Sequence, residues 1–244
     1  MKILVCISNV PDTTTKITFT DNNTQFNTNG VQFILNPYDE IALARAIELT
    51  EGNGSVTVIN VGEVNTEPTI RKALAIGATD AVRVNALPHD AWFVAKQIAE
   101  YAKQGGFDLI LTGRESIDYN GAKVAGMVGE LLDIPSVSVI KKLEVSGDSA
   151  TVEREIEGGK EILTIPFPFV AGTAEGVAEP KIPNMRGIMS ARTKPLQVIE
   201  PVTVTNNLEV TAYETPAPRG QVKLIKADET ATLVDLLHTE AKVI

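Results

Sequence analysis

The segment FDLILTGRESIDYNGAKVAGMVGELLD, residues 107–133, changes its hydrophobic period halfway along. Residues 107–112 form a short apolar run closed by Gly113, which predicts a buried strand. Beyond Gly121 the apolar residues recur at helical spacing, at Val124, Met127, Val128, Leu131 and Leu132. The sequence therefore predicts a strand that leads into a helix beginning near Gly121.

The junction between these two elements, GRESIDYNG at residues 113–121, is polar and contains two glycines. A helix that starts at the carboxyl end of a parallel strand presents free backbone N–H groups and a positive dipole end, which suit a phosphate. Ser116, Asp118 and Asn120 could contact a sugar or a base, or could simply cap the helix. An ordinary strand-to-helix connection explains the junction equally well, because it matches neither GxGxxG nor a Walker loop.

Composition narrows the class of protein. The 244 residues are 43% hydrophobic and 22% charged, as in a soluble globular protein, and the net charge of −9 disfavours nucleic acid as a partner. Cys6 is the one cysteine, so no internal disulfide can form, and two histidines are few for a metal site or a catalytic triad. No apolar run reaches the roughly 18 residues of a membrane span, and no leader pattern precedes the first strand. We expect a soluble protein of the bacterial cytoplasm that is not inserted in a membrane.

Strands and helices are expected to alternate through the first half of the chain. The predicted strands, each followed by a helix, cover residues 2–7, 55–61, 81–84 and 107–112. This order predicts an α/β fold, a doubly wound and mostly parallel sheet with helices on both faces. Four loops then converge at the carboxyl ends of the strands: those after Cys6, before the helix at Asn36, after Val61 and after Thr112. Such folds bind nucleotides at this position.

The first helix has a recognisable start. Asn36 stands at the cap position, Pro37 at the first helical position, and acidic residues follow. Asp39 could contact a nucleotide, or could stabilise the helix end as any acid does there. Arg114 could pair with a phosphate, or with its neighbour Glu115 in a surface salt bridge.

The second half of the chain begins with a change to period two. Alternation over residues 137–145, 150–156 and 161–166 predicts an antiparallel meander at the edge of the sheet, and residues 169–173 predict one more buried strand. Residues 200–244 are too few to form a core of their own, so we expect an arm with a terminal helix at 232–242.

Residues 176–195 follow neither period and are predicted to form a long loop. The loop is locally basic, because residues 181–199 contain no acid. It carries exposed apolar side chains and cations: Ile182, Met185, Ile188, Met189, Lys181, Arg186, Arg192 and Lys194. A long loop with this mixture is more often functional than idle.

Six stretches of the chain, in order, resemble the β subunit of electron transfer flavoprotein. They are ILVCISNVPD, NPYDEIALARA, TIRKALAIGATDAVRV, GRESIDYNGAKVAGMVGELLDIP, VEREIEGGKE and EPKIPNMRGIMSARTKPL. The resemblance covers residues 1 to about 200. It implies a Rossmann-like domain at residues 1–195 with an antiparallel edge meander, and a C-terminal arm at residues 196–244 that packs on an α subunit. In that family the α subunit holds most of the redox FAD, close to the interface.

The resemblance also implies a structural AMP in the crevice of the β subunit. The positions that match the family's nucleotide contacts are Cys6, Asn36, Pro37, Tyr38, Asp39, Val61, Gly113, Arg114, Ser116, Asp118, Asn120, Gly121, Ala122, Lys123 and Val124. Tyr38 could instead touch the flavin edge across the interface, or pack in the core. Electron-bifurcating members hold a second FAD in this crevice and usually carry Asp-Gly-Asp-Thr at residues 118–121. The bulky Tyr119 in that run favours AMP.

Residues 176–195 match the family's recognition loop, which docks acyl-CoA dehydrogenases through one leucine. Met185 stands at the leucine position, and the lysine-rich end of the loop is reduced to Arg192 and Lys194. The expected docking residues are Ile182, Met185, Arg186, Ile188 and Met189. The resemblance implies an electron carrier with no substrate turnover of its own, which passes electrons to a quinone-reducing acceptor. A bifurcating carrier and a stand-alone nucleotide-binding sensor domain are the alternatives.

Overall fold

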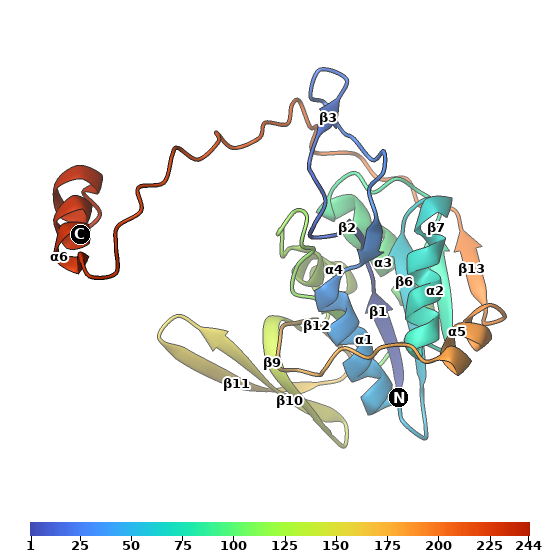
Figure 1. Ribbon diagram of the computed structural model, residues 1–244. Coiled ribbons are helices and arrows are strands. Elements are labelled where there is room, and N and C mark those ends of the chain that lie inside the picture. Colours follow the sequence, from blue (N-terminus) through green and yellow to red (C-terminus); the bar gives the residue numbers. More distant parts are fainter. The chain divides into compact units, whose positions relative to one another are not determined.

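Nine strands form the main sheet of the computed structural model, which describes residues 1–244. They are β1 (Lys2–Cys6), β6 (Ser55–Val61), β7 (Asp80–Val84), β8 (Leu109–Gly113), β9 (Ser136–Ser146), β10 (Ser149–Ile156), β11 (Gly159–Pro166), β12 (Phe169–Thr173) and β13 (Leu196–Ile199). Their order across the sheet is β11-β10-β9-β12-β8-β1-β6-β7-β13 (Figure 1). All neighbours from β9 to β13 pair in parallel, whereas β9, β10 and β11 pair antiparallel. The predicted parallel sheet with an antiparallel edge meander is confirmed.

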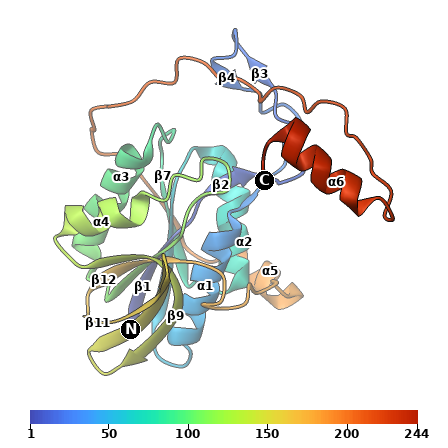
Figure 2. The same ribbon diagram turned by 90° about the vertical axis from the view of Figure 1, so that its left-hand side faces the viewer.

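Helices cover both faces of this sheet, as the alternation of elements predicted. They are α1 (Pro37–Leu49), α2 (Glu67–Ile76), preceded by the 3₁₀ turn η1 (Val64–Thr66), α3 (Ala91–Gly105), α4 (Val124–Leu132) and α5 (Met185–Ala191). α1 and α2 bury their apolar residues against one face, and α3 and α4 against the other (Figure 2). The fold is Rossmann-like and doubly wound.

Strand β1 shows why the sheet is buried on both sides. Ile3 and Val5 point into the core beneath α1 and α2, whereas Leu4 and Cys6 point into the core beneath α3 and α4. Successive strand residues face opposite sides of a sheet, so a continuous apolar run is what a strand covered on both faces requires.

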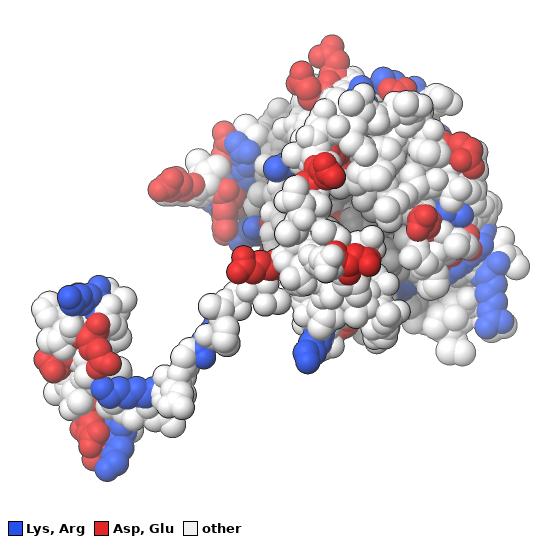
Figure 3. All heavy atoms as spheres, turned by 90° about the horizontal axis from the view of Figure 1, so that it is seen from above, with Lys and Arg blue, Asp and Glu red and all other residues white.

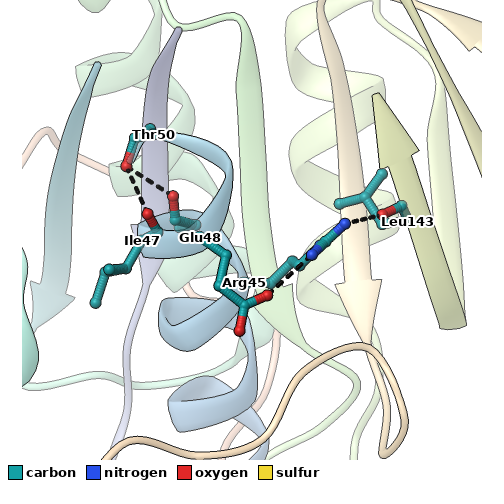
Figure 4. Close-up of polar contacts among 6 residues, drawn as sticks. Arg45, Ile47, Glu48, Thr50 and Leu143 are labelled. Atoms are coloured by element: carbon teal, nitrogen blue, oxygen red, sulfur yellow. Dashed lines mark hydrogen bonds and ion pairs between the residues drawn. The ribbon is translucent and has the colours of Figure 1, made fainter. Parts of the chain in front are cut away.

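Helix α1 is tied to the meander by one side chain. Arg45 forms an ion pair with Glu48 at 2.9 Å and donates a hydrogen bond to the backbone oxygen of Leu143 on β9 (Figure 4). At the end of the same helix, the Thr50 hydroxyl donates to the carbonyls of Ala46 and Ile47 at 2.8 and 3.3 Å. The helix therefore ends at Thr50, shortly before Gly52 and Gly54.

Four local predictions differ from the structure. Helix α4 begins at Val124 rather than near Gly121, because Asn120 and Ala122 adopt left-handed conformations with φ of 49° and 51° that a helix cannot contain. The expected polar turn after β1 contains β2 (Asn9–Pro11), which pairs antiparallel with β5 (Phe33–Leu35).

The other two differences lie near the predicted start of the arm. The expected loop of residues 176–195 contains the helix α5. Residues 196–199, which the sequence assigned to the arm, form β13 and pair with β7, and the compact unit that contains the main sheet continues to Val210. These four residues thus pair with β7 as an edge strand of the sheet rather than belonging to a separate arm.

A second compact unit consists of residues 19–26 and 211–244. Its hairpin pairs β3 (Phe19–Thr20) with β4 (Gln25–Phe26). The Phe19 ring stacks on Tyr213 with centroids 5.0 Å apart, and the Tyr213 N–H donates to the Asn23 carbonyl at 2.7 Å. The terminal helix is present as α6 (Thr230–Leu236), which continues into a π-helical turn, η2 (Leu237–Ala241). None of the helices in the chain combines the length and the apolar character that crossing a membrane requires.

Candidate functional site

The direction of winding changes between β1 and β8. From β1 the chain proceeds outward through β6 and β7, then returns to form β8 on the other side of β1. The loops after β1 and β8 therefore separate and leave a crevice at their carboxyl ends, where doubly wound folds bind ligands. Figure 3 views the main body from this side, and its surface is hollowed near the middle, with acidic and basic side chains scattered around it.

Asp39 joins the two strand ends that border the crevice. One carboxylate oxygen accepts the Ser8 N–H, just after β1, at 2.7 Å, and the other accepts the Gly113 N–H, at the end of β8, at 2.9 Å. The side chain is buried, with a residue exposure of 4%. Burial raises the pKa of Asp39 to about 7, although hydrogen bonds from Asn36, Ser8 and Gly113 oppose the increase. Both carboxylate oxygens are engaged within the protein, so Asp39 fixes the shape of the crevice.

Asn36 stands at the N-cap of α1 as predicted, but its side chain makes no capping hydrogen bond. Its amide donates to the Glu115 carbonyl at 2.9 Å, and its side-chain oxygen accepts the Ile117 N–H at 3.2 Å. The Asn36 backbone N–H donates to the Ser8 carbonyl at 3.1 Å. Asn36 therefore holds the junction loop after β8 against the loop after β1.

Gly113 allows this close approach. A Cβ at this position would lie 2.4 Å from an Asp39 carboxylate oxygen and 2.7 Å from the Tyr38 Cβ. Thr173 adds a further link from β12, because its hydroxyl donates to the Thr112 carbonyl at 3.0 Å and its backbone oxygen accepts the Arg114 N–H at 2.8 Å. The turn after β8 is thus fixed on both sides.

Tyr38 and Arg114 lie together at the rim. The Arg114 guanidinium is 5.4 Å from the centre of the Tyr38 ring and forms a 3.5 Å ion pair with Glu115. Burial and a hydrogen bond to Glu175 raise the pKa of Tyr38. Both side chains are partly exposed, so they remain accessible to a ligand or a partner at the rim.

The junction from Ser116 to Lys123 supplies backbone groups rather than a rigid set of side chains. The Asn120 N–H donates to the Ser116 carbonyl at 2.8 Å, and an Asp118 oxygen accepts the Tyr119 N–H at 2.9 Å. From residue 118 to 123 the chain is exposed. The N-cap residue of α4, Lys123, makes no side-chain capping bond, which leaves the first N–H groups of that nine-residue helix without a side-chain partner.

Cys6 and Val61 are the last residues of β1 and β6, and their side chains are buried in the core. Only their backbone groups could contact a ligand in the crevice. Burial raises the pKa of the Cys6 thiol, which keeps it protonated and unreactive. Hydrogen bonds join three of the four loops selected from the sequence, those after Cys6, before α1 and after Thr112, at this crevice. The loop after Val61 follows the neighbouring strand β6 at the same edge of the sheet.

Sequence reasoning missed two residues that shape the site, Ser8 and Thr173. Ser8 donates its N–H to Asp39, and Thr173 holds the turn after β8 through both its hydroxyl and its carbonyl. Ser8 follows the buried apolar strand β1, and Thr173 ends the buried apolar strand β12. A position at the carboxyl end of such a strand is the signal that could have identified both residues.

Within the segment of residues 176–195, helix α5 packs on the last turn of α2. Ile182 is 93% exposed and Met185 73% exposed. Met189, Ile188 and Arg186 are exposed as well, and all but Ile182 belong to α5. Met185, Ile188 and Met189 stand three and four residues apart on α5, so these three exposed side chains share one face of the helix.

Comparison with known proteins identifies the family of the chain. The model of the electron transfer flavoprotein domain matches residues 23–204. The electron transfer flavoprotein subunit beta of Bacillus subtilis is 34% identical, and the match covers 100% of both chains. The subunit of the same name from Homo sapiens is 32% identical over 96% of this chain and 95% of its own, and that from Syntrophomonas wolfei is 32% identical over 90% and 88%. The chain therefore belongs to the electron transfer flavoprotein β subunit family.

Proposed function

We propose that this chain is the β subunit of a heterodimeric electron carrier. Together with an α subunit it holds a redox FAD, receives electrons from acyl-CoA and other dehydrogenases, and delivers them to a quinone-reducing acceptor. The observation that carries the proposal is the match to electron transfer flavoprotein β subunits along the full length of both chains. The chain acts as a carrier subunit and turns over no substrate itself.

The crevice between β1 and β8 suits a structural AMP. A phosphate would be bound by the backbone N–H groups at Gly121, Ala122, Lys123 and Val124, which lie at the uncapped start of α4. A side chain at Gly121 would have open space around it, so nothing in the protein fills this position. Asn120 and Ala122 adopt left-handed conformations, which also occur in anion-binding backbone concavities. The residues present therefore fit a phosphate.

The side chains that border the crevice have a supporting role in this proposal. Asp39 and Asn36 make no bond to the nucleotide through their side chains, because both are engaged in holding the loops. Ser116 and Asp118 remain available for the ribose. Tyr38, at the rim, forms part of the wall that faces the flavin.

FAD supplies the reversible redox chemistry when it is bound, and this chain supplies part of its enclosure. Residues 200–244 provide the surface for the α subunit. In that segment the apolar side chains of Leu208, Val222, Leu224 and Val234 are exposed, which a solitary chain would rarely maintain. Contact with the α subunit would cover them.

Coexpression with an electron transfer flavoprotein α subunit from the same organism tests the proposal. The expected result is a stable, yellow heterodimer whose flavin is reduced under anaerobic conditions by an acyl-CoA dehydrogenase and its substrate. A colourless chain that remains alone and binds a nucleotide would contradict the proposal and favour the sensor domain. A heterodimer that contains flavin but is not reduced by any dehydrogenase would support the assignment of FAD. It would refute the assignment of residues 176–195 to dehydrogenase docking.

A further inference from the structure

Helix α5 has only seven residues, too few to be stable by itself in water. Asn184 caps its start, accepting the Gly187 N–H at 2.8 Å. Ala191 is the one buried residue of the helix, while Met185 and Met189 extend into solvent. Contacts with the rest of the protein must therefore hold this helix in place, and among its side chains only that of Ala191 is buried in the core.

One contact is between the backbones of α5 and α2. A Cβ on Gly187 would lie 2.3 Å from the backbone oxygen of Ala75. Glycine at this position lets α5 lie directly on the last turn of α2, where any larger residue would separate the two helices.

Arg71, on α2, binds the end of α5. Its Nη1 donates to the Ala191 carbonyl at 2.8 Å and to the Lys194 carbonyl at 2.9 Å. The last carbonyls of a helix have no partner within the helix, and a cation is well suited to them.

Lys194 makes the complementary contact in the opposite direction. Its Nζ donates to the Leu74 carbonyl at 2.9 Å and to the Ala78 carbonyl at 2.5 Å, at the C-terminal end of α2. The last turn of α2 contains no basic residue of its own. Each helix end is therefore neutralised by a cation that comes from the other segment.

We propose that Arg71 and Lys194 form a reciprocal clasp that positions α5 for docking, and that the charge of Lys194 takes no direct part in docking. The role of α5 in docking rests on the proposed function, whereas the clasp rests on the hydrogen bonds alone. The sequence grouped Lys194 with Arg192 as the remnant of a basic docking end. In the structure only Arg192 is exposed, and the Lys194 ammonium is directed at α2.

The proposal separates two kinds of cation on one segment. A cation that meets a charged partner accelerates association, and its removal weakens the dependence of the rate on salt. A cation that positions the docking helix changes the stability of that helix and leaves the salt dependence as it was. Lys194 belongs to the second kind and Arg192 to the first.

The test compares Lys194→Met, Arg71→Met and Arg192→Met in the purified heterodimer. Hydrogen exchange of the amides of residues 185–191 reports the clasp, with the amides of α3 as an internal reference. Both Lys194→Met and Arg71→Met should accelerate exchange in α5 by about tenfold and leave α3 unchanged, because exchange follows local opening. Arg192→Met, the matched control, should leave the exchange rates of both α5 and α3 unchanged.

The second readout is the rate of flavin reduction by an acyl-CoA dehydrogenase with its substrate, measured at several salt concentrations. Lys194→Met should raise KM with the salt dependence intact, and Arg192→Met should flatten the salt dependence. Unchanged exchange in Lys194→Met or in Arg71→Met, or a flattened salt dependence in Lys194→Met, would overturn the clasp. If the unmodified heterodimer accepted no electrons, the docking role would fail, and the exchange result would still decide the clasp.

Discussion

Two regions of the molecule use backbone and side chains in opposite ways. They are the crevice between β1 and β8 and the proposed docking segment, residues 176–195. In the crevice, Asp39 and Asn36 direct their side chains inward to fix the loops, and backbone N–H groups remain for a ligand. In the docking segment the backbone is fixed by Arg71 and Lys194, and the side chains remain exposed.

This difference corresponds to what each region is proposed to bind. A phosphate is recognised well by rigid backbone donors, which lose no side-chain entropy on binding. A protein partner with an apolar pocket requires side chains that can fill it, and Met is well suited because it adapts to irregular pockets. The following predictions test whether each region depends on the part of the chain assigned to it.

The largest effect is expected from Gly113→Ala. The new Cβ would collide with the Asp39 carboxylate and with the backbone carbon of Tyr38, 2.9 Å away, so the link between β1 and β8 must distort. A cost of about 3 kcal/mol in the free energy of unfolding is expected, together with loss of nucleotide from the crevice. Denaturant unfolding and nucleotide analysis of the heterodimer measure both.

Gly126→Ala is the matched control for that variant. Gly126 lies within α4, and a Cβ there would meet nothing within 4 Å. Alanine should therefore stabilise the helix by about 0.5–1 kcal/mol. Equal losses in the two variants would show that steric contact at Gly113 is not what matters.

A smaller effect is expected from Asp39→Asn. The amide keeps the shape but can accept only one of the two N–H groups from Ser8 and Gly113, which should cost about 1–3 kcal/mol. The docking segment should be unaffected, with an unchanged KM for the dehydrogenase.

The difference in stability between the natural protein and Asp39→Asn should change with pH in a definite direction. The pKa of Asp39 rises from its ordinary value of 3.8 to about 7 in the folded protein, so the folded state binds more protons than the unfolded state between these pH values. Stability from Asp39 therefore falls as pH rises from about 4 to about 7, and is constant above that window. The advantage of the natural protein over Asp39→Asn should shrink across the same range. An advantage that grew with pH would show that the two N–H bonds, which favour the ionised carboxylate, outweigh burial.

The smallest effect on folding is expected from Met185→Ala. Met185 is mostly exposed, so its removal should leave unfolding and flavin content unchanged. Truncation of a central docking residue should still weaken electron uptake from the dehydrogenase by about tenfold. Ile162→Ala, an exposed apolar residue on β11, is the control and should change neither property. Lost flavin with unchanged docking kinetics would refute the assignment of this segment.

The sequence predicted the elements whose hydrophobic period is strong. The bounds of β6 and β12 agree with those expected, because each is a buried strand closed by a glycine or by polar residues. Topology then selected the crevice, since the order of strands and helices determines which loops meet there.

Elements held by tertiary contacts were not predictable in the same way. Helix α5 is too short to show a period, and its one local signal was Asn184 at the cap position. Asn36 and Lys194 were assigned local or outward roles, whereas their side chains bind backbone at Glu115 and at Ala78, residues far away in the sequence. Such distant partners cannot be read from the composition of the segment itself.

The nucleotide content of the purified heterodimer tests the central claim most directly. The complex is denatured, and the released FAD and AMP are quantified against the amount of protein. Equal amounts of FAD and AMP, each matching the heterodimer, are the predicted result, because Tyr119 and the backbone donors of the crevice suit AMP. Twice as much FAD and no AMP would contradict the account in favour of a bifurcating carrier, and no nucleotide at all would refute the crevice as a binding site.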